Sequence, residues 1–200
     1  QRFFAAWDAR GEGGVTLANL DAARRVFAEV SEPLLAQLPP SDAALEQTRL
    51  FGSAPSVGIV DVVLAMEASR SGAVLGRWLE YRLEGEFSLG DADRRVPLRG
   101  VADRIDLLEG NRLRVIDYKT GSAPERGRAL QVPIYALCAQ ERLAAKGDGQ
   151  WALDEALYIS FSGKRASVRV ADSGGTEMLE SAPAPVFAIV GPINGGSVPG

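Results

Sequence analysis

The sequence predicts an α/β domain with a mixed central sheet and an N-terminal helical segment. Residues 1–70 repeat their apolar positions at helical spacing. Near Val74 the pattern changes to strand-like segments separated by turn signals, and residues 128–146 then return to a helical pattern before two more strand-like segments. Helices, three strands, a helix and further strands in this order are typical of an α/β domain.

The composition excludes several classes of protein. The 200 residues are 46% hydrophobic and carry 22 Lys and Arg against 26 Asp and Glu, a net charge of −4. A disordered chain would be less apolar and more charged. There is no apolar run of about 18 residues and no secretory signal, so we expect no membrane partner. Because the chain begins at Gln1 rather than Met, we expect a fragment of a larger protein.

Four helices are expected in the first 70 residues. They are QRFFAAWDAR, Asn19 to about Ser31, SDAALEQTRLF and residues 56–69. Asn19 or Asp21 can cap the second helix, and Ser41 or Asp42 the third. Pro33 predicts a kink, and the Pro39–Pro40 pair predicts a stop.

The strands are expected within LEYRLEGEFSL, VPLRGVADRIDLL, RLRVIDYKT, EALYISFSG and ASVRVAD. The EGN sequence between Leu108 and Arg112 predicts a hairpin turn. Apolar residues of 128–146 follow one helical face. We therefore divide the chain into a helical part (1–70), a core (71–172) and a tail (173–200) with a short helix in VFAIVGPI.

Two absences limit the chemistry. The chain has one cysteine, Cys138, and no histidine. This excludes a disulfide framework, thiolate metal clusters and histidine-based nucleophilic dyads, and it predicts a reducing, cytoplasmic location. Catalysis would have to use carboxylates, Lys, Tyr, Ser or Thr, with a metal held by oxygen ligands.

Basic residues gather in one window of this acidic chain. Between Arg94 and Arg128 there are nine Lys and Arg residues against five Asp and Glu. A basic sheet predicts a polyanionic ligand. Solvated strand faces are the alternative that charge alone leaves open.

The most informative stretch is GVADRIDLLEGNRLRVIDYKTG. It places Asp103 and Asp117 in two strands joined by the EGN turn, with Lys119 on the same strand face as Asp117. Two carboxylates at a strand end predict a site for a hard divalent cation, and the ammonium can stabilise developing negative charge. An isolated pair of this kind is more often a structural ion pair, with Asp103, Arg104 and Asp106 as solvated charges.

The flanking motifs favour the site. The sequence resembles the PD-(D/E)XK nuclease superfamily, and more narrowly the nuclease domains of RecB- and AddB-type helicase–nucleases. The resemblance is carried by GVADRID (Gly100–Asp106), IDYKTG (Ile116–Gly121) and the Gln131…Tyr135 pair in LQVPIYAL. It implies a restriction-endonuclease-like fold with residues 71–172 as the nuclease core.

The resemblance also implies roles for these residues. Asp103, Asp117 and the backbone carbonyl of Tyr118 would bind Mg²⁺, with Mn²⁺ as the alternative metal. Lys119 would position the attacking water and stabilise the phosphate, while Gln131 and Tyr135 would orient the site or contact the nucleic-acid backbone. A further carboxylate often comes from the preceding element, and the candidates are Glu84, which we prefer, and Glu86.

The implied function is a metal-dependent (exo)deoxyribonuclease domain. It would be a module of a recombination-repair helicase–nuclease, with DNA, the rest of a larger chain and a helicase subunit as partners. A histidine expected just before Gln1, and cysteines for an iron–sulfur cluster, are not in this sequence. The alternatives are a catalytically inactive DNA-binding or scaffold module and a small-molecule hydrolase.

Overall fold

The computed structural model describes most of the chain, and the described residues divide into two compact units after Ala73. Described are residues 1–88, 95–121, 124, 129–147, 149–161, 167–172 and 188–190, the last two ranges for the backbone only. No helix among these residues is long and apolar enough to cross a membrane.

The first unit is helical, as predicted. Its elements are α1 (Arg2–Asp8), a 3₁₀ turn (Leu17–Asn19), α2 (Leu20–Leu35), α3 (Pro40–Phe51), β1 (Gly52–Ser53), β2 (Ser56–Val57) and α4 (Ile59–Ala68). The aromatic side chains of α1 are buried: Phe3 stacks on Trp7 at 5.9 Å and contacts Phe27 of α2 at 5.5 Å between ring centroids. Aromatic packing therefore joins the first two helices.

The prolines in this unit lie inside α2 and at the start of α3. Pro33 lies inside α2, which continues to Leu35, and α3 begins at Pro40 with Pro39 as its N-cap. Proline suits the first position of a helix because its missing N–H would have no partner within the helix there. The pair Pro39–Pro40 thus starts a helix, and neither Ser41 nor Asp42 is the N-cap.

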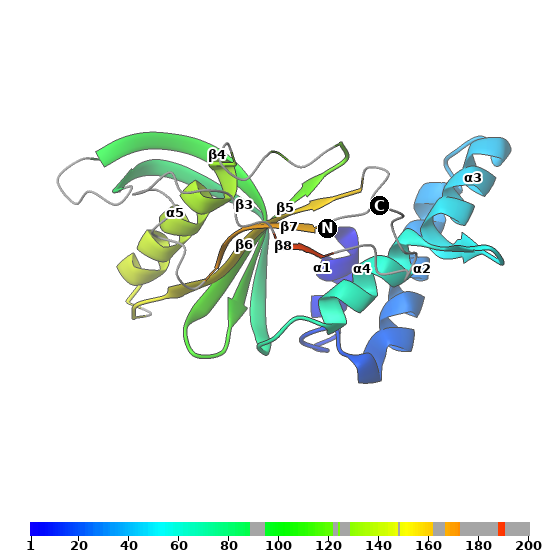
Figure 1. Cartoon of the computed structure of the whole chain (residues 1–200), viewed down its shortest axis with the longest axis horizontal. Coiled ribbons are helices and arrows are strands. Elements are labelled where there is room, and N and C mark those ends of the chain that lie inside the picture. The colour runs from blue at the N-terminus through cyan, green and yellow to red at the C-terminus, as the bar shows by residue number, and fades with distance from the viewer. Residues whose placement is uncertain are drawn as a thin grey trace, which may run out of the picture. The chain divides into compact units, whose positions relative to one another are not determined.

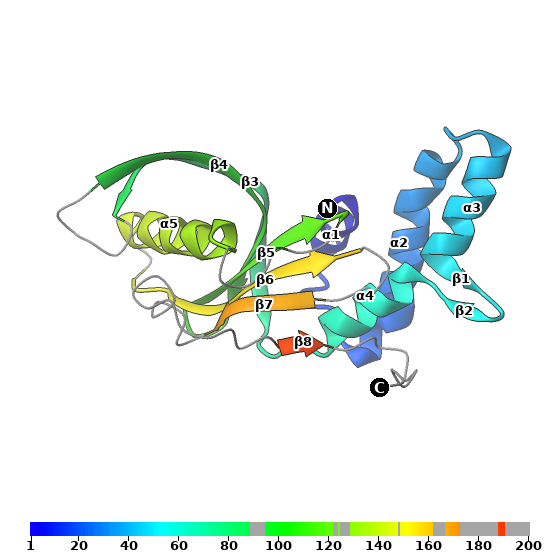
Figure 2. The same cartoon turned by 45° about the horizontal axis from the view of Figure 1, so that its top comes forward.

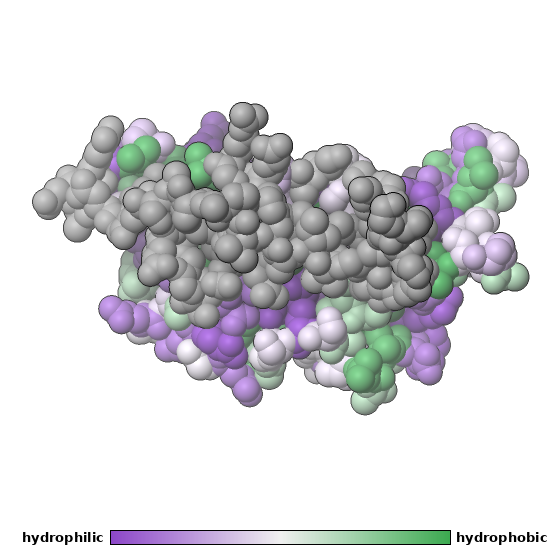
Figure 3. All heavy atoms as spheres, in the orientation of Figure 1, coloured by the Kyte–Doolittle hydropathy of each residue, from purple (hydrophilic) through white to green (hydrophobic). Residues whose placement is uncertain are grey.

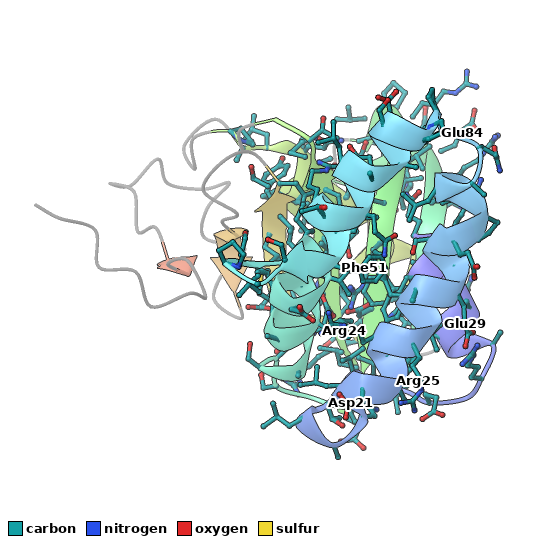
Figure 4. All side chains as sticks on the ribbon, turned by 90° about the vertical axis from the view of Figure 1, so that its right-hand side faces the viewer. Asp21, Arg24, Arg25, Glu29, Phe51 and Glu84 are labelled. Atoms are coloured by element: carbon teal, nitrogen blue, oxygen red, sulfur yellow. The ribbon has the colours of Figure 1, made fainter. Side chains whose placement is uncertain are left out.

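An open groove lies between α2 and α3. Phe51 at the end of α3 contacts Phe27 of α2, with ring centroids 6.3 Å apart, and Arg25 and Glu29 of α2 also line the groove (Figure 4). Apolar and hydrophilic side chains are intermixed on the surface near α3, where Leu45 is 70% exposed (Figure 3). This groove belongs to the helical unit.

The second unit contains the predicted mixed sheet. Its elements are β3 (Val74–Ser88), β4 (Arg95–Leu108), β5 (Arg112–Lys119), α5 (Gln131–Ala145), β6 (Ala152–Ser160), β7 (Ser167–Asp172) and β8 (Ala188–Val190). These strands lie in sequence order, and among the pairs that the described residues form only β5–β6 is parallel. The EGN turn is confirmed, with positive φ at Gly110 (73°) and Asn111 (53°).

The core of this unit lies between α5 and the sheet. The long strands β3 and β4 curve around α5 (Figures 1 and 2). Apolar residues of α5 pack on strand residues of the same buried cluster, including Leu83, Ile105, Leu113, Val115, Val132, Ala136 and Leu143. In the tail, the described residues Ala188–Val190 form β8 rather than part of a helix. The remainder of the helix expected there lies outside the described residues.

Candidate active site

A break in strand alternation places Asp103. Ala102 and Ile105 both join the cluster under α5, although residues three apart in a regular strand face opposite sides. The alternation therefore reverses between them. At this point of β3, Glu80 lies between the registered pairs Leu79–Arg104 and Tyr81–Ala102 and has φ 49°. The β3–β4 pair is thus kinked where Glu80 faces Asp103.

Beyond the β4–β5 ladder, the carboxylate of Asp103 accepts a backbone hydrogen bond from β5 that a carbonyl of β4 would accept in a regular sheet. The β4–β5 ladder ends at Arg104–Ile116, whereas the β5–β6 ladder continues to Lys119–Ser160. Beyond that end, the backbone N–H of Tyr118 donates to Asp103 Oδ2 at 2.8 Å. On the other edge, the Lys119 carbonyl accepts from the Phe161 N–H at 2.9 Å. Because backbone groups alternate along a strand, the Tyr118 carbonyl faces the β4 edge.

Asp117 is buried and incompletely satisfied. It is 4% exposed, and its Oδ2 lies 2.7 Å from Lys119 Nζ in an ion pair. Among the described residues, no hydrogen bond of normal geometry reaches this oxygen. Burial raises the pKa of Asp117; the close contact with Lys119 and the charge of its ammonium oppose this rise, and the nearby charge of Asp103 adds to it. The site concentrates negative charge that a cation would stabilise.

A chain of polar contacts connects Lys119 to α5. Lys119 Nζ donates to Gln131 Oε1 at 3.2 Å, and Gln131 Nε2 donates to the Tyr135 hydroxyl at 3.3 Å. Gln131 and Tyr135 are one helical turn apart, so both reach the same side of α5. These hydrogen bonds orient the Lys119 ammonium through side chains of α5.

Two residues that the sequence analysis did not place in the site also belong there. A Cβ on Gly100 would lie 2.5 Å from the Tyr135 hydroxyl, so only glycine allows this close approach. The Tyr158 ring lies 5.3 Å from Lys119 Nζ, and burial raises the pKa of Tyr158 to about 12. Gly100 could have been found from its place in the GVADRID motif; Tyr158 stands in a buried strand run that carries no such signal.

The structure brings together Asp103, Asp117, Lys119, Gln131 and Tyr135, with the Tyr118 backbone between them. It does not bring Glu84 into this group. Glu84 of β3 pairs in register with Arg99 of β4, and its Oε1 lies 3.8 Å from Arg99 Nε in an exposed ion pair. No cluster of three or more acidic, Cys or His side chains suited to a metal occurs in the described part of the chain.

The basic window does not form one cationic face. Arg104 and Arg114 are 0% and 1% exposed and are paired with buried carboxylates. Arg112 pairs with Asp154, and Arg95 pairs with Glu141. Arg104 and Asp106 are therefore not solvated charges. The prediction of a basic sheet surface is wrong for Arg95, Arg104, Arg112 and Arg114, because each is paired with a carboxylate. Arg94, Arg126 and Arg128 lie outside the described residues.

The oxygen atoms next to the end of the β4–β5 ladder fit a hard divalent cation. Two carboxylates and a backbone carbonyl supply only oxygen atoms, which are the ligands that Mg²⁺ prefers. Asp117 Oδ2 is a buried oxygen that still has capacity to accept. An ammonium held beside these oxygens suits the stabilisation of an anionic transition state.

Comparison with known proteins assigns the chain to a family. The chain is 35% identical over 46 residues to uncharacterized proteins of Rickettsia bellii (strain RML369-C) and Rickettsia typhi (strain ATCC VR-144 / Wilmington). These matches cover 23% of this chain and only 6% and 5% of the relatives, so the matched segment is a small part of their length. The model of the PD-(D/E)XK nuclease superfamily matches residues 6–186, and the chain therefore belongs to this superfamily.

Proposed function

We propose that the chain is a metal-dependent DNA nuclease domain that hydrolyses phosphodiester bonds. The observation that carries the proposal is the continuous contact chain from Asp117 through Lys119 and Gln131 to Tyr135, with Asp103 beside it. Membership of the superfamily supports a nuclease-like domain. The kink at Asp103, next to the end of the β4–β5 ladder, also supports the proposal, because it brings this carboxylate to the Tyr118 backbone.

Each side chain has a separate task in the proposed reaction. Asp103, Asp117 and the Tyr118 carbonyl would hold a divalent cation, for which we propose Mg²⁺. When bound, the cation supplies Lewis acidity to a phosphoryl oxygen. Lys119 offers its ammonium to the attacking water and to negative charge that develops on the phosphate. Gln131 holds that ammonium in place through its side-chain oxygen.

The sequence motifs support a narrower proposal. GVADRID, IDYKTG and the Gln131–Tyr135 pair are similar to those of RecB- and AddB-type nucleases. We therefore propose that the domain degrades DNA ends as an exonuclease within a larger helicase–nuclease. Double-strand-break repair and recombination would be its setting, with a helicase subunit as partner.

The test compares a site variant with a matched aspartate variant. End-labelled linear single- and double-stranded DNA and a circular duplex are incubated with the chain in Mg²⁺. Wild type should shorten the linear substrates and spare the circle. Asp117→Asn should lose cleavage on the order of 10²-fold or more. Asp42→Asn, an exposed residue of the first turn of α3, should cleave like wild type.

The outcomes separate the two main functions. DNA binding without cleavage by wild type in Mg²⁺ or Mn²⁺ would overturn the enzyme proposal and favour an inactive DNA-binding or scaffold module. Equal cleavage by wild type and Asp117→Asn would place the active site elsewhere. Cleavage of the circular duplex would contradict exonuclease action and show that the domain is an endonuclease.

A further inference from the structure

Behind the site, a buried group of charged side chains covers the other face of the same strands. We call it the arginine network. Its members come from four strands and are Arg77, Arg104, Asp106, Arg114, Asp154 and Glu155. Asp106 lies between Ile105 and Leu107, and Arg114 between Leu113 and Val115, all of which pack toward α5. Because side chains alternate, the network lies on the face away from α5.

Arg104 connects this network to the site. Asp106 grips it in a fork, with Arg104 Nε 2.7 Å from Oδ1 and Nη2 2.6 Å from Oδ2. The remaining Nη1 donates to the Tyr118 hydroxyl at 3.0 Å. A forked guanidinium has little freedom to rotate, so its third nitrogen is a fixed donor.

Tyr118 connects the network face of β5 to the edge of β5 that faces β4. Its ring is held on the network face by Arg104 and is stacked on Phe161 at 6.0 Å. Its backbone N–H holds the Asp103 carboxylate at 2.8 Å. The β4–β5 ladder ends two residues before Tyr118, so these two hydrogen bonds connect β4 to β5 beyond the ladder.

We propose that Arg104 and the Tyr118 hydroxyl are positioning groups for the Asp103 carboxylate. They set the separation of β4 and β5 just beyond the end of the β4–β5 ladder, and thereby the distance between the oxygens of Asp103 and Asp117. This rests on the proposed function only in taking these carboxylates as the cation site. Neither group touches the substrate; both act through the Tyr118 backbone.

Tyr118→Phe is the cleanest variant, because it removes one hydroxyl and keeps the ring that stacks on Phe161. Tyr81→Phe is the matched control, since it makes the same chemical change on β3. Substituting Asp106 would be less informative, because three arginines surround that carboxylate and the fold itself would suffer.

The measurement is Mn²⁺ binding by isothermal titration calorimetry, together with the NMR shift of the amide proton at position 118. Tyr118→Phe should weaken Mn²⁺ binding roughly tenfold, as loss of an outer hydrogen bond does in metal sites. The amide proton should move upfield as its bond to Asp103 lengthens. The melting temperature should stay within a few degrees of wild type, and cleavage should recover at high Mg²⁺. Tyr81→Phe should change none of these.

Three outcomes would overturn the proposal. In the first, Tyr118→Phe binds Mn²⁺ as tightly as wild type and its amide proton at position 118 does not shift. In the second, Tyr81→Phe loses as much Mn²⁺ affinity as Tyr118→Phe. In the third, the wild-type protein binds no Mn²⁺. A chain that binds Mn²⁺ but never cleaves DNA would contradict the nuclease proposal alone. The positioning proposal would then still be decided by the binding and NMR measurements.

Discussion

The two faces of the β4–β5 hairpin treat buried charge in opposite ways. On the network face, Arg104 and Arg114 are each paired with carboxylates at 2.6–3.1 Å. On the α5 face, Asp117 retains an oxygen without a normal hydrogen bond, and burial raises its pKa. Arg104 and Arg114 have carboxylate partners in hydrogen-bond geometry, whereas Asp117 Oδ2 is paired with Lys119 outside that geometry. A buried carboxylate held in this way is typical of functional sites and agrees with the cation site proposed on the α5 face.

Aspartate truncation should show the contrast most strongly. Asp106→Ala should lower the free energy of unfolding by about 3–5 kcal/mol, because it leaves buried arginines uncompensated. Asp117→Ala should cost much less, since it removes a carboxylate whose charge burial already disfavours. Urea unfolding followed by circular dichroism measures both. Similar losses for the two variants would mean that the faces do not differ.

Lysine substitution tests the α5 face through chemistry rather than stability. Lys119→Ala should reduce DNA cleavage by on the order of 10²–10³-fold in Mg²⁺ while the protein stays folded. Lys146→Ala, at the end of α5 against the Trp78 ring, is the matched control and should cleave normally. Cleavage by Lys119→Ala at the wild-type rate would remove this lysine from the proposed mechanism.

The next prediction concerns the contact of β4 with α5. Gly100→Ala should displace Tyr135 and cost about 1–3 kcal/mol, because the new Cβ would overlap its ring and hydroxyl. In a Tyr135→Ala background the same change should cost much less, which a double-mutant cycle by urea unfolding measures. Gly76→Ala has open space around its Cβ and serves as the control. Additive effects would show that the close approach is not the reason for glycine.

The sequence predicted the sheet, the helix α5 that covers it, and the proximity of Asp103, Asp117 and Lys119. These features follow from strand alternation and motif spacing, which are local signals. The sequence could not predict which charges are buried. Arg104 and Asp106 resemble solvated strand charges until the fold places partners from β3, β4 and β5 around them. The kink at Asp103 was likewise invisible, because it depends on the conformation of a residue in another strand, Glu80. Long-range pairing decides both features.

The smallest predicted effect concerns that kink. Glu80 has φ 49°, a left-handed conformation that is strained for residues with a Cβ, so Glu80→Gly should raise the free energy of unfolding by about 0.5–1 kcal/mol. Glu84→Gly makes the same change in the same strand without positive φ, and it should destabilise by roughly 0.5–1 kcal/mol. Opposite signs in urea unfolding would show that the kink is strained in wild type. If both variants lose stability equally, the strain argument fails, and the kink must be held only by the contacts of Asp103 and the core on either side of it.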